Sequence, residues 1–313
     1  MSPPRERANL GPMSAASTRA IALALIANGG IAAAKFAVFG LTRSSSLLTE
    51  AIHSVADCAN QVLLYLGLRQ GQAGPTARHP LGRGKAAFVA SFLVALLLFS
   101  VGGIYSVVEG IHKILHPEHP HDLGWAVGLL VFAIALEGWS MRGALKAAAP
   151  ERRGRPLIRY MRDSSSTELV VVLAEDFAAL LGLVLALGAV LLTLATGNPV
   201  WDGIGSVAIG LLLIAVAAFV GVEVTSLLLN EAPPLALRAA IREAVAEDPQ
   251  VDQVLHLVAV IIGSDRLMVS LQVQFREQPT GQALVEAIDA LERRLKARFP
   301  QIRHLFVEPD ESA

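Results

Sequence analysis

Apolar residues along the chain gather into six long runs that are separated by short polar segments. Each run is about 20 residues or longer, which is the length of helix that crosses the hydrocarbon core of a bilayer. The fifth run is the clearest, because LLGLVLALGAVLLTLATG contains no charged residue. The pattern predicts six membrane-spanning helices, near residues 20–41, 47–68, 86–111, 123–145, 168–196 and 203–229.

The second run differs from the others because it carries a regular polar stripe. Its polar residues are Glu50, His53, Asp57 and Asn60, at spacings of 3, 4 and 3. Such spacings place all four on one face of a helix. An ionisable side chain at the bilayer centre costs about 2.5–3.5 kcal/mol on insertion scales, so these residues usually face the bundle interior and mark an ion path. The alternative is that they act as polar contacts between helices.

Carboxylate and imidazole groups are ligands that suit Zn²⁺ and neighbouring divalent metals. His53 and Asp57 lie one turn apart and can reach the same ion. Two ligands do not complete a tetrahedron, and the fifth run offers Glu175 and Asp176. Adjacent residues point about 100° apart on a helix, so both need not face the ion. We expect Asp176 to complete the site, with Glu175 as the alternative.

The composition changes after Asn230. The segment EAPP ends the helical pattern, and the later residues are amphipathic. RLMVSLQVQF alternates between apolar and polar residues, as a half-buried strand does. Residues 231–313 predict the order α-β-β-α-β. We therefore divide the chain into a cytoplasmic lead at 1–19, a six-helix transport domain at 20–230 and a small α+β domain at 231–313.

The distribution of charge predicts the orientation in the membrane. Cytoplasmic loops carry an excess of Lys and Arg. The segments after the second and fourth runs carry Arg69, Arg78, Arg83, Lys85, Arg142, Lys146, Arg152, Arg153, Arg155, Arg159 and Arg162. The alternate segments carry only Arg43 and Lys113. Both termini are thus expected in the cytoplasm. Residues 231–313 hold 9 Lys+Arg and 13 Asp+Glu, and this acidic balance argues against nucleic acid as a partner.

With these features in place, the chain resembles the cation diffusion facilitator family over about residues 18–310. The phrases SSSLLTEAIHSVADCANQ, RHPLGRGKAAF and PVWDGIGSVAIGLLL carry the resemblance, and others point to the branch of the zinc-transporter-9-like proteins. The resemblance implies a homodimer whose ferredoxin-like cytoplasmic domains pair, and which exports a divalent cation, Zn²⁺ first, in exchange for protons. Mn²⁺, Fe²⁺ and Co²⁺ are alternative cargoes. It implies no bound cofactor, and the simple N-terminus favours a bacterial inner membrane.

The same resemblance assigns metal ligands residue by residue. His53, Asp57 and Asp176 match the family's ligand positions, whereas its fourth position falls at Val172, which cannot ligate. Either Glu175 in the same helix or a water molecule is then expected to take the fourth place. Glu50 and Asn60 are expected to support the ligands or to line the path.

The family's cytoplasmic metal sites are only partly represented. His79 matches one loop position, but Arg83 stands at the next. His256 and Glu308 match or lie near ligand positions of the soluble domain, and Ser270 and Phe306 replace histidines. We therefore expect weak cytoplasmic metal binding at most.

Two other functions were weighed. An intramembrane metalloenzyme would need an open metal position and a general base, and no HExxH sequence occurs. The GRGK sequence at 82–85 lacks the phosphate-binding pattern GxxxxGK[ST], so Lys85 is expected to cap the inner end of the third helix.

The second alternative function is a non-transporting membrane scaffold that signals through residues 231–313.

Overall fold

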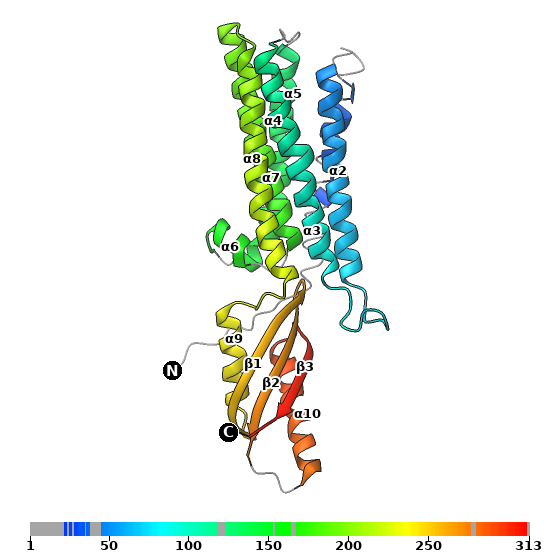
Figure 1. The fold of residues 1–313 in the computed structure, drawn as a ribbon, viewed down its shortest axis with the longest axis vertical. Coiled ribbons are helices and arrows are strands. Elements are labelled where there is room, and N and C mark those ends of the chain that lie inside the picture. The colour runs from blue at the N-terminus through cyan, green and yellow to red at the C-terminus, as the bar shows by residue number, and fades with distance from the viewer. Residues whose placement is uncertain are drawn as a thin grey trace.

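The computed structural model describes residues 22–23, 25–26, 28–34, 36–37, 45–117, 123–152, 154–163, 167–276 and 280–311. It shows a bundle of long helices with a small α+β unit at one end (Figure 1). The bundle contains α2 (Ser45–Gly71), α3 (Ala86–Leu97), the π-helical segment η1 (Leu98–Ile104), α4 (Tyr105–Leu115), α5 (Leu123–Arg152), α6 (Leu157–Asp163), α7 (Thr167–Thr196) and α8 (Val200–Leu228). The α+β unit contains α9 (Leu235–Ala246), β1 (Val251–Gly263), β2 (Arg266–Phe275), α10 (Gly281–Arg298) and β3 (Ile302–Pro309).

Four helices among the described residues are long and apolar enough to cross a membrane. They are Ala86–Leu115, Gly124–Pro150, Leu169–Thr196 and Val200–Leu228. These match the third to sixth predicted spans, and the third and fourth extend further toward their C-terminal ends than the apolar runs suggested. The second predicted span lies within the 27-residue helix α2. The described residues between 22 and 37 of the first predicted span are helical. Six spans in total stay a prediction.

The bundle exposes large apolar side chains on its outside and buries several polar ones within an otherwise apolar interior, as expected of a protein surrounded by lipid. Large apolar side chains such as Phe177, Leu211 and Val222 are 51%, 57% and 69% exposed. Polar side chains such as Gln61 and Ser140 are almost fully buried. The protein is therefore an integral, multi-pass membrane protein.

The third span and α8 approach each other through glycine. A Cβ atom on Gly110 would lie 2.8 Å from the carbonyl oxygen of Gly203, and one on Gly210 would lie 2.8 Å from the carbonyl oxygen of Gly103. Small residues at such positions let two helix backbones come close, which is how membrane helices gain packing energy without a hydrophobic effect between them. This contact sets the position of α8, which packs on α7 in turn.

The soluble unit has the element order that the sequence predicts. Its strands form one sheet in the order β1-β2-β3, with β1 antiparallel and β3 parallel to β2. One face of β2 is buried, as the alternation predicts, through Leu267, Val269, Leu271 and Val273. Helices α9 and α10 pack against the outer strands β1 and β3, and Leu291 and Leu295 of α10 join that core.

The bundle and the soluble unit meet near the start of α3. Gly84 lies against Gly263 in the turn between β1 and β2, where a Cβ on Gly263 would be 2.7 Å from the Cα of Gly84. The Lys85 ammonium group donates to the carbonyl oxygen of Leu228 at 3.0 Å and to the Oδ1 atom of Asn230. Lys85 therefore caps the end of α8. Lys85 is the N-cap residue of α3, as expected, but its side chain makes no capping hydrogen bond there, because it reaches across to the free carbonyl groups of a neighbouring helix end.

Candidate cation site in the helical bundle

Asn60, the one residue of the polar stripe of α2 whose side chain is described, faces the interior, and so do its neighbours Ser54 and Gln61. Ser54, Asn60 and Gln61 are 2%, 4% and 0% exposed. Val55 and Val62, on another face of the same helix, are 49% and 43% exposed. The described polar side chains of the helix thus turn inward and Val55 and Val62 turn outward, whereas Leu64 and Leu68 join the apolar core.

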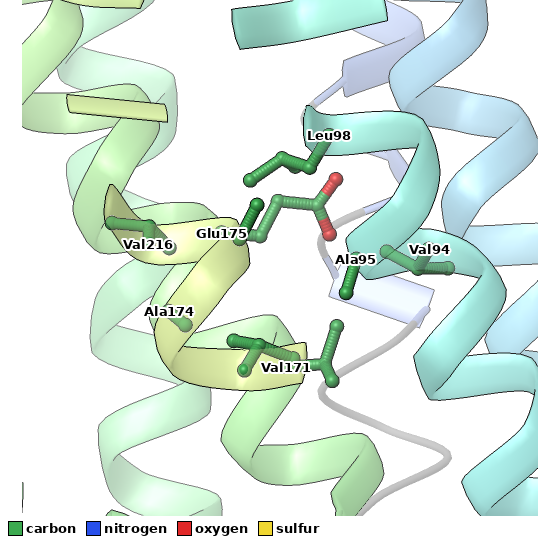
Figure 2. A pocket seen from close by; sticks show the side chains of 9 residues that line it. Val94, Ala95, Leu98, Val171, Ala174, Glu175 and Val216 are labelled. Carbon is green, nitrogen blue, oxygen red and sulfur yellow. The ribbon is translucent and has the colours of Figure 1, made fainter. Parts of the chain in front are cut away.

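Glu175 on α7 is the residue that those α2 amides meet. Its carboxylate accepts hydrogen bonds from Asn60 Nδ2 at 3.3 Å and from Gln61 Nε2 at 2.7 Å. It is 7% exposed. Figure 2 shows it among the apolar side chains of Val94, Ala95 and Leu98, beside a cavity of about 10 Å³. An intramembrane carboxylate therefore joins α2 to α7 and lies next to α3.

The amide oxygens of Asn60 and Gln61 are left as buried acceptors. An ionised carboxylate only accepts hydrogen bonds, so both amides must turn their NH₂ groups to Glu175. Asn60 Oδ1 and Gln61 Oε1 then have no hydrogen-bond partner within the part of the chain that the structure describes. Amide oxygens are suitable ligands for hard divalent cations. Asn60 can therefore serve a cation directly or support its ligands.

Asp176 faces a different helix. Its Oδ2 atom accepts a hydrogen bond from the Ser140 hydroxyl of α5 at 3.0 Å, and the residue is 2% exposed. Because adjacent helical residues point about 100° apart, Glu175 meets α2 while Asp176 meets α5. The two carboxylates of α7 thus address two neighbouring helices, and both are buried.

The remaining predicted ligands lie on α2. The backbone of Glu50, His53 and Asp57 is helical, and their side chains lie outside the described residues. Among the side chains that are described, no three of His, Cys, Asp or Glu come together to hold a metal. Val172 is fully buried and offers no ligand. The set His53, Asp57, Asp176 and Glu175 therefore stays a prediction.

The predicted cytoplasmic metal residues are spread over two parts of the structure. His79 lies in the α2–α3 loop, where its backbone pairs with that of Thr76. His256 on β1 and Glu308 on β3 share one row of the sheet, but Gln272 of β2 lies between them. The Gln272 amide donates to Glu308 at 3.1 Å. Since neighbouring strands are about 4.8 Å apart, the two residues are two strand spacings apart.

Several buried polar residues among the described part of the bundle were not given a site role from the sequence. Gln61 contacts Glu175, Ser140 contacts Asp176, and Glu137 on α5 is 5% exposed. Glu137 could have been identified from the sequence, because it is an ionisable residue inside the fourth apolar run. No comparable signal marks Ser140, because a serine in a membrane helix commonly bonds to its own backbone.

The sequence of the chain is similar to those of known cation transporters. Residues 21–229 match the family model described as the cation efflux transmembrane domain. The chain is 29% identical to a Xenopus laevis protein named "Proton-coupled zinc antiporter SLC30A9, mitochondrial", over 93% of this chain and 59% of that protein. It is 30% identical to the Arabidopsis thaliana "Metal tolerance protein C4", over 84% of this chain and 58% of that protein. The chain therefore spans less than two thirds of the length of either relative.

Proposed function

The chain belongs to the cation efflux family of transporters, and on that premise we propose that it exports a divalent cation, most readily Zn²⁺, in exchange for protons. The observation that carries the proposal is the pair of buried carboxylates on α7, one facing α2 and the other facing α5. The names of the vertebrate relatives support both the zinc cargo and the proton coupling. No catalytic step is part of the proposal.

The exchange follows from the chemistry of the ligands. A metal binds deprotonated carboxylate and neutral imidazole, so its binding at His53, Asp57, Asp176 and Glu175 releases protons. Facing the cytoplasm, the site takes up the cation. Facing the other side, it releases the cation and accepts protons. Rocking of helices around a site near the middle of the membrane supplies the alternating access, as in other secondary transporters.

The direction in which the cation is transported depends on the orientation of the chain in the membrane. The excess of Lys and Arg in the segments on the side of the soluble unit supports cytoplasmic termini, and export then follows from an inward proton gradient. The bacterial inner membrane stays a prediction from the sequence, because the vertebrate relatives are named mitochondrial. Immunolabelling of an epitope placed after Asp310, in intact and permeabilised cells, tests the orientation.

The central test of the function is metal uptake into sealed vesicles that hold the purified protein, under an imposed pH gradient. We expect uptake of Zn²⁺ to exceed that of Co²⁺, Mn²⁺ and Fe²⁺, each measured at matched free concentration. If another of these metals were taken up faster than Zn²⁺, that metal would be assigned as the cargo. Absence of uptake for all four metals by a folded protein would contradict transport and favour the scaffold alternative.

We further propose that the soluble units, ferredoxin-like in their element order, pair in a homodimer through the open face of the sheet. Helices α9 and α10 pack against the sheet, and the opposite face carries apolar side chains. Val258, Ser270 and Phe306 form one row across the three strands. Val258 is 42% and Phe306 54% exposed. An exposed apolar row of this kind fits a second copy of the same surface.

A cross-linking experiment tests this pairing. The chain has a single cysteine, Cys58, so Phe306→Cys in a Cys58→Ser background offers a single thiol on the open face. We expect a short bifunctional maleimide to convert most of this variant to covalent dimer. The matched control is Asp289→Cys in the same background, on the exposed side of α10, which should remain monomeric. Equal cross-linking at both positions would contradict the proposed face.

A further inference from the structure

Glu137 is a buried carboxylate in the middle of a membrane helix. It lies in the candidate span Gly124–Pro150 and is 5% exposed. At a rise of 1.5 Å per residue, it is about 20 Å along α5 from Leu123, well inside a hydrocarbon core of about 30 Å. Insertion scales assign an ionisable residue at such a depth a cost of about 2.5–3.5 kcal/mol. A residue kept there at that cost calls for a role beyond filling space.

The face of α5 that holds Glu137 points toward Asp176 of α7. Ser140 lies three residues further along α5, on the same face. Its hydroxyl donates to Asp176 Oδ2 at 3.0 Å, which fixes the direction of that face. Cβ atoms three residues apart on a helix are about 5–6 Å apart. Glu137 is therefore a near neighbour of the Ser140–Asp176 contact.

The first helical segment bounds the same region. A Cβ atom on Gly30 would lie 3.6 Å from Leu136 Cδ1, and Gly143 approaches Leu23. These two contacts pair lower numbers on one helix with higher numbers on the other, so the segment runs antiparallel to α5. Asn28, a polar residue 8% exposed, comes near the level of Glu137. Glu137 thus lies in a polar layer of the bundle and not against lipid.

The level of Glu137 along the membrane normal follows from helix direction. Helices α5 and α7 pack together and run antiparallel, since α5 ends and α7 begins on the side of the soluble unit (Figure 1). Glu137 precedes Ser140, so it lies about one turn farther from the soluble unit than the Ser140–Asp176 contact. Val172, which replaces an expected ligand, lies one turn on the opposite side of Asp176 and is fully buried. On the side of Asp176 away from the soluble unit, the next carboxylate is therefore Glu137. On the side nearer the soluble unit, the next turn of α7 is apolar.

We propose that Glu137 binds the transported cation on the side of Asp176 away from the soluble unit, so that α5 lines the ion path together with α2 and α7. The proposal rests on the proposed transport function. Carboxylate oxygens suit divalent metals, and Glu137 offers the cation a ligand after it leaves the carboxylates of α7. The path then bends from the α2–α7 interface toward the α5–α7 interface.

The test asks whether the negative charge of the residue 137 side chain matters more for transport than its size. Glu137→Gln keeps the size and hydrogen-bonding capacity of the side chain but removes its charge, whereas Glu137→Asp keeps the carboxylate. Glu109→Gln is the matched control, because Glu109 lies in another span, Ala86–Leu115. Zn²⁺ uptake into vesicles gives the turnover and the KM for the metal. Equilibrium titration with Co²⁺ in detergent gives its affinity without transport.

We expect Glu137→Gln to lower kcat/KM for Zn²⁺ by about 10-fold or more and to weaken Co²⁺ binding, since removal of groups that only support metal ligands already costs about 10–100-fold. Glu137→Asp should recover most of the loss, and Glu109→Gln should match the wild type. A role in hydrogen bonding alone would reverse the order, with Gln active and Asp inactive, and would overturn the proposal.

Two further outcomes are decisive. Wild-type kinetics for Glu137→Gln, with Asp57→Ala inactive in the same vesicles, would overturn this proposal and leave the transport function intact. Absence of flux in the wild type would instead contradict the transport function itself. If Glu137→Gln does not fold, Glu137→Ala decides: weakened Co²⁺ binding in detergent supports cation binding by this residue, and wild-type Co²⁺ affinity overturns it.

Discussion

Gly110→Leu is expected to destabilise the protein by about 3 kcal/mol or more, at the upper end of what overpacking costs. A Cβ atom at this position would lie 2.7 Å from the Val207 nitrogen and 2.8 Å from the carbonyl oxygen of Gly203. Both atoms belong to the backbone of α8, so no side-chain rotation can relieve the clash. The two helices must separate, and each further atom of leucine increases the separation.

A matched control isolates that clash. Gly188 lies in α7, and no atom lies within 4 Å of the position of its Cβ. Gly188→Leu should therefore retain the thermal unfolding midpoint of the wild type, measured by circular dichroism in detergent, or raise it. Gly110→Leu should lower it markedly and reduce the yield of folded protein. Equal midpoints for the two variants would mean that the glycine contact between the third span and α8 does not hold the bundle together.

Asp57→Ala is expected to abolish metal transport, with a loss of about 100-fold or more, larger than the loss caused by removing a group that only supports a ligand. Asp57 lies one turn after His53 on α2, on the helix whose described polar side chains turn inward. Alanine favours the helix, so folding should survive. Uptake of Zn²⁺ under a pH gradient measures the effect.

The neighbouring residue supplies the control for that prediction. Cys58 is half-buried on the same helix, and Cys58→Ser should transport within about twofold of the wild type, since a small change on the side of a membrane helix costs little. Transport retained by Asp57→Ala would move the cation site away from the polar stripe of α2, toward the carboxylates of α5 and α7.

The sequence predicted the soluble unit closely because its elements alternate with clear periods. The pattern RLMVSLQVQF becomes β2 with the predicted face buried, since a period of two has only one way to bury its apolar side. The third to sixth membrane helices were also predicted, but not all of their ends. Helix α5 continues to Arg152, well beyond the apolar run, because a helix does not need apolar residues once it leaves the hydrocarbon core.

The contacts between polar side chains inside the bundle could be predicted only in part from the sequence. The inward face of α2 could be predicted from spacing alone. The partner of that face could not: Glu175 meets Asn60 and Gln61, while Asp176 meets Ser140. Which of two adjacent carboxylates faces which helix depends on the rotation of α7, and an apolar helix has no amphipathic pattern that sets its rotation.

The most direct test of cation–proton exchange is to record metal uptake and proton movement together, in vesicles that hold the wild-type protein, with one dye for Zn²⁺ and one for internal pH. The account predicts that an imposed pH gradient drives Zn²⁺ in one direction and protons in the other, and that Zn²⁺ added without a gradient creates one. Movement of Zn²⁺ with no accompanying proton flux, from a folded protein in sealed vesicles, would contradict the exchange.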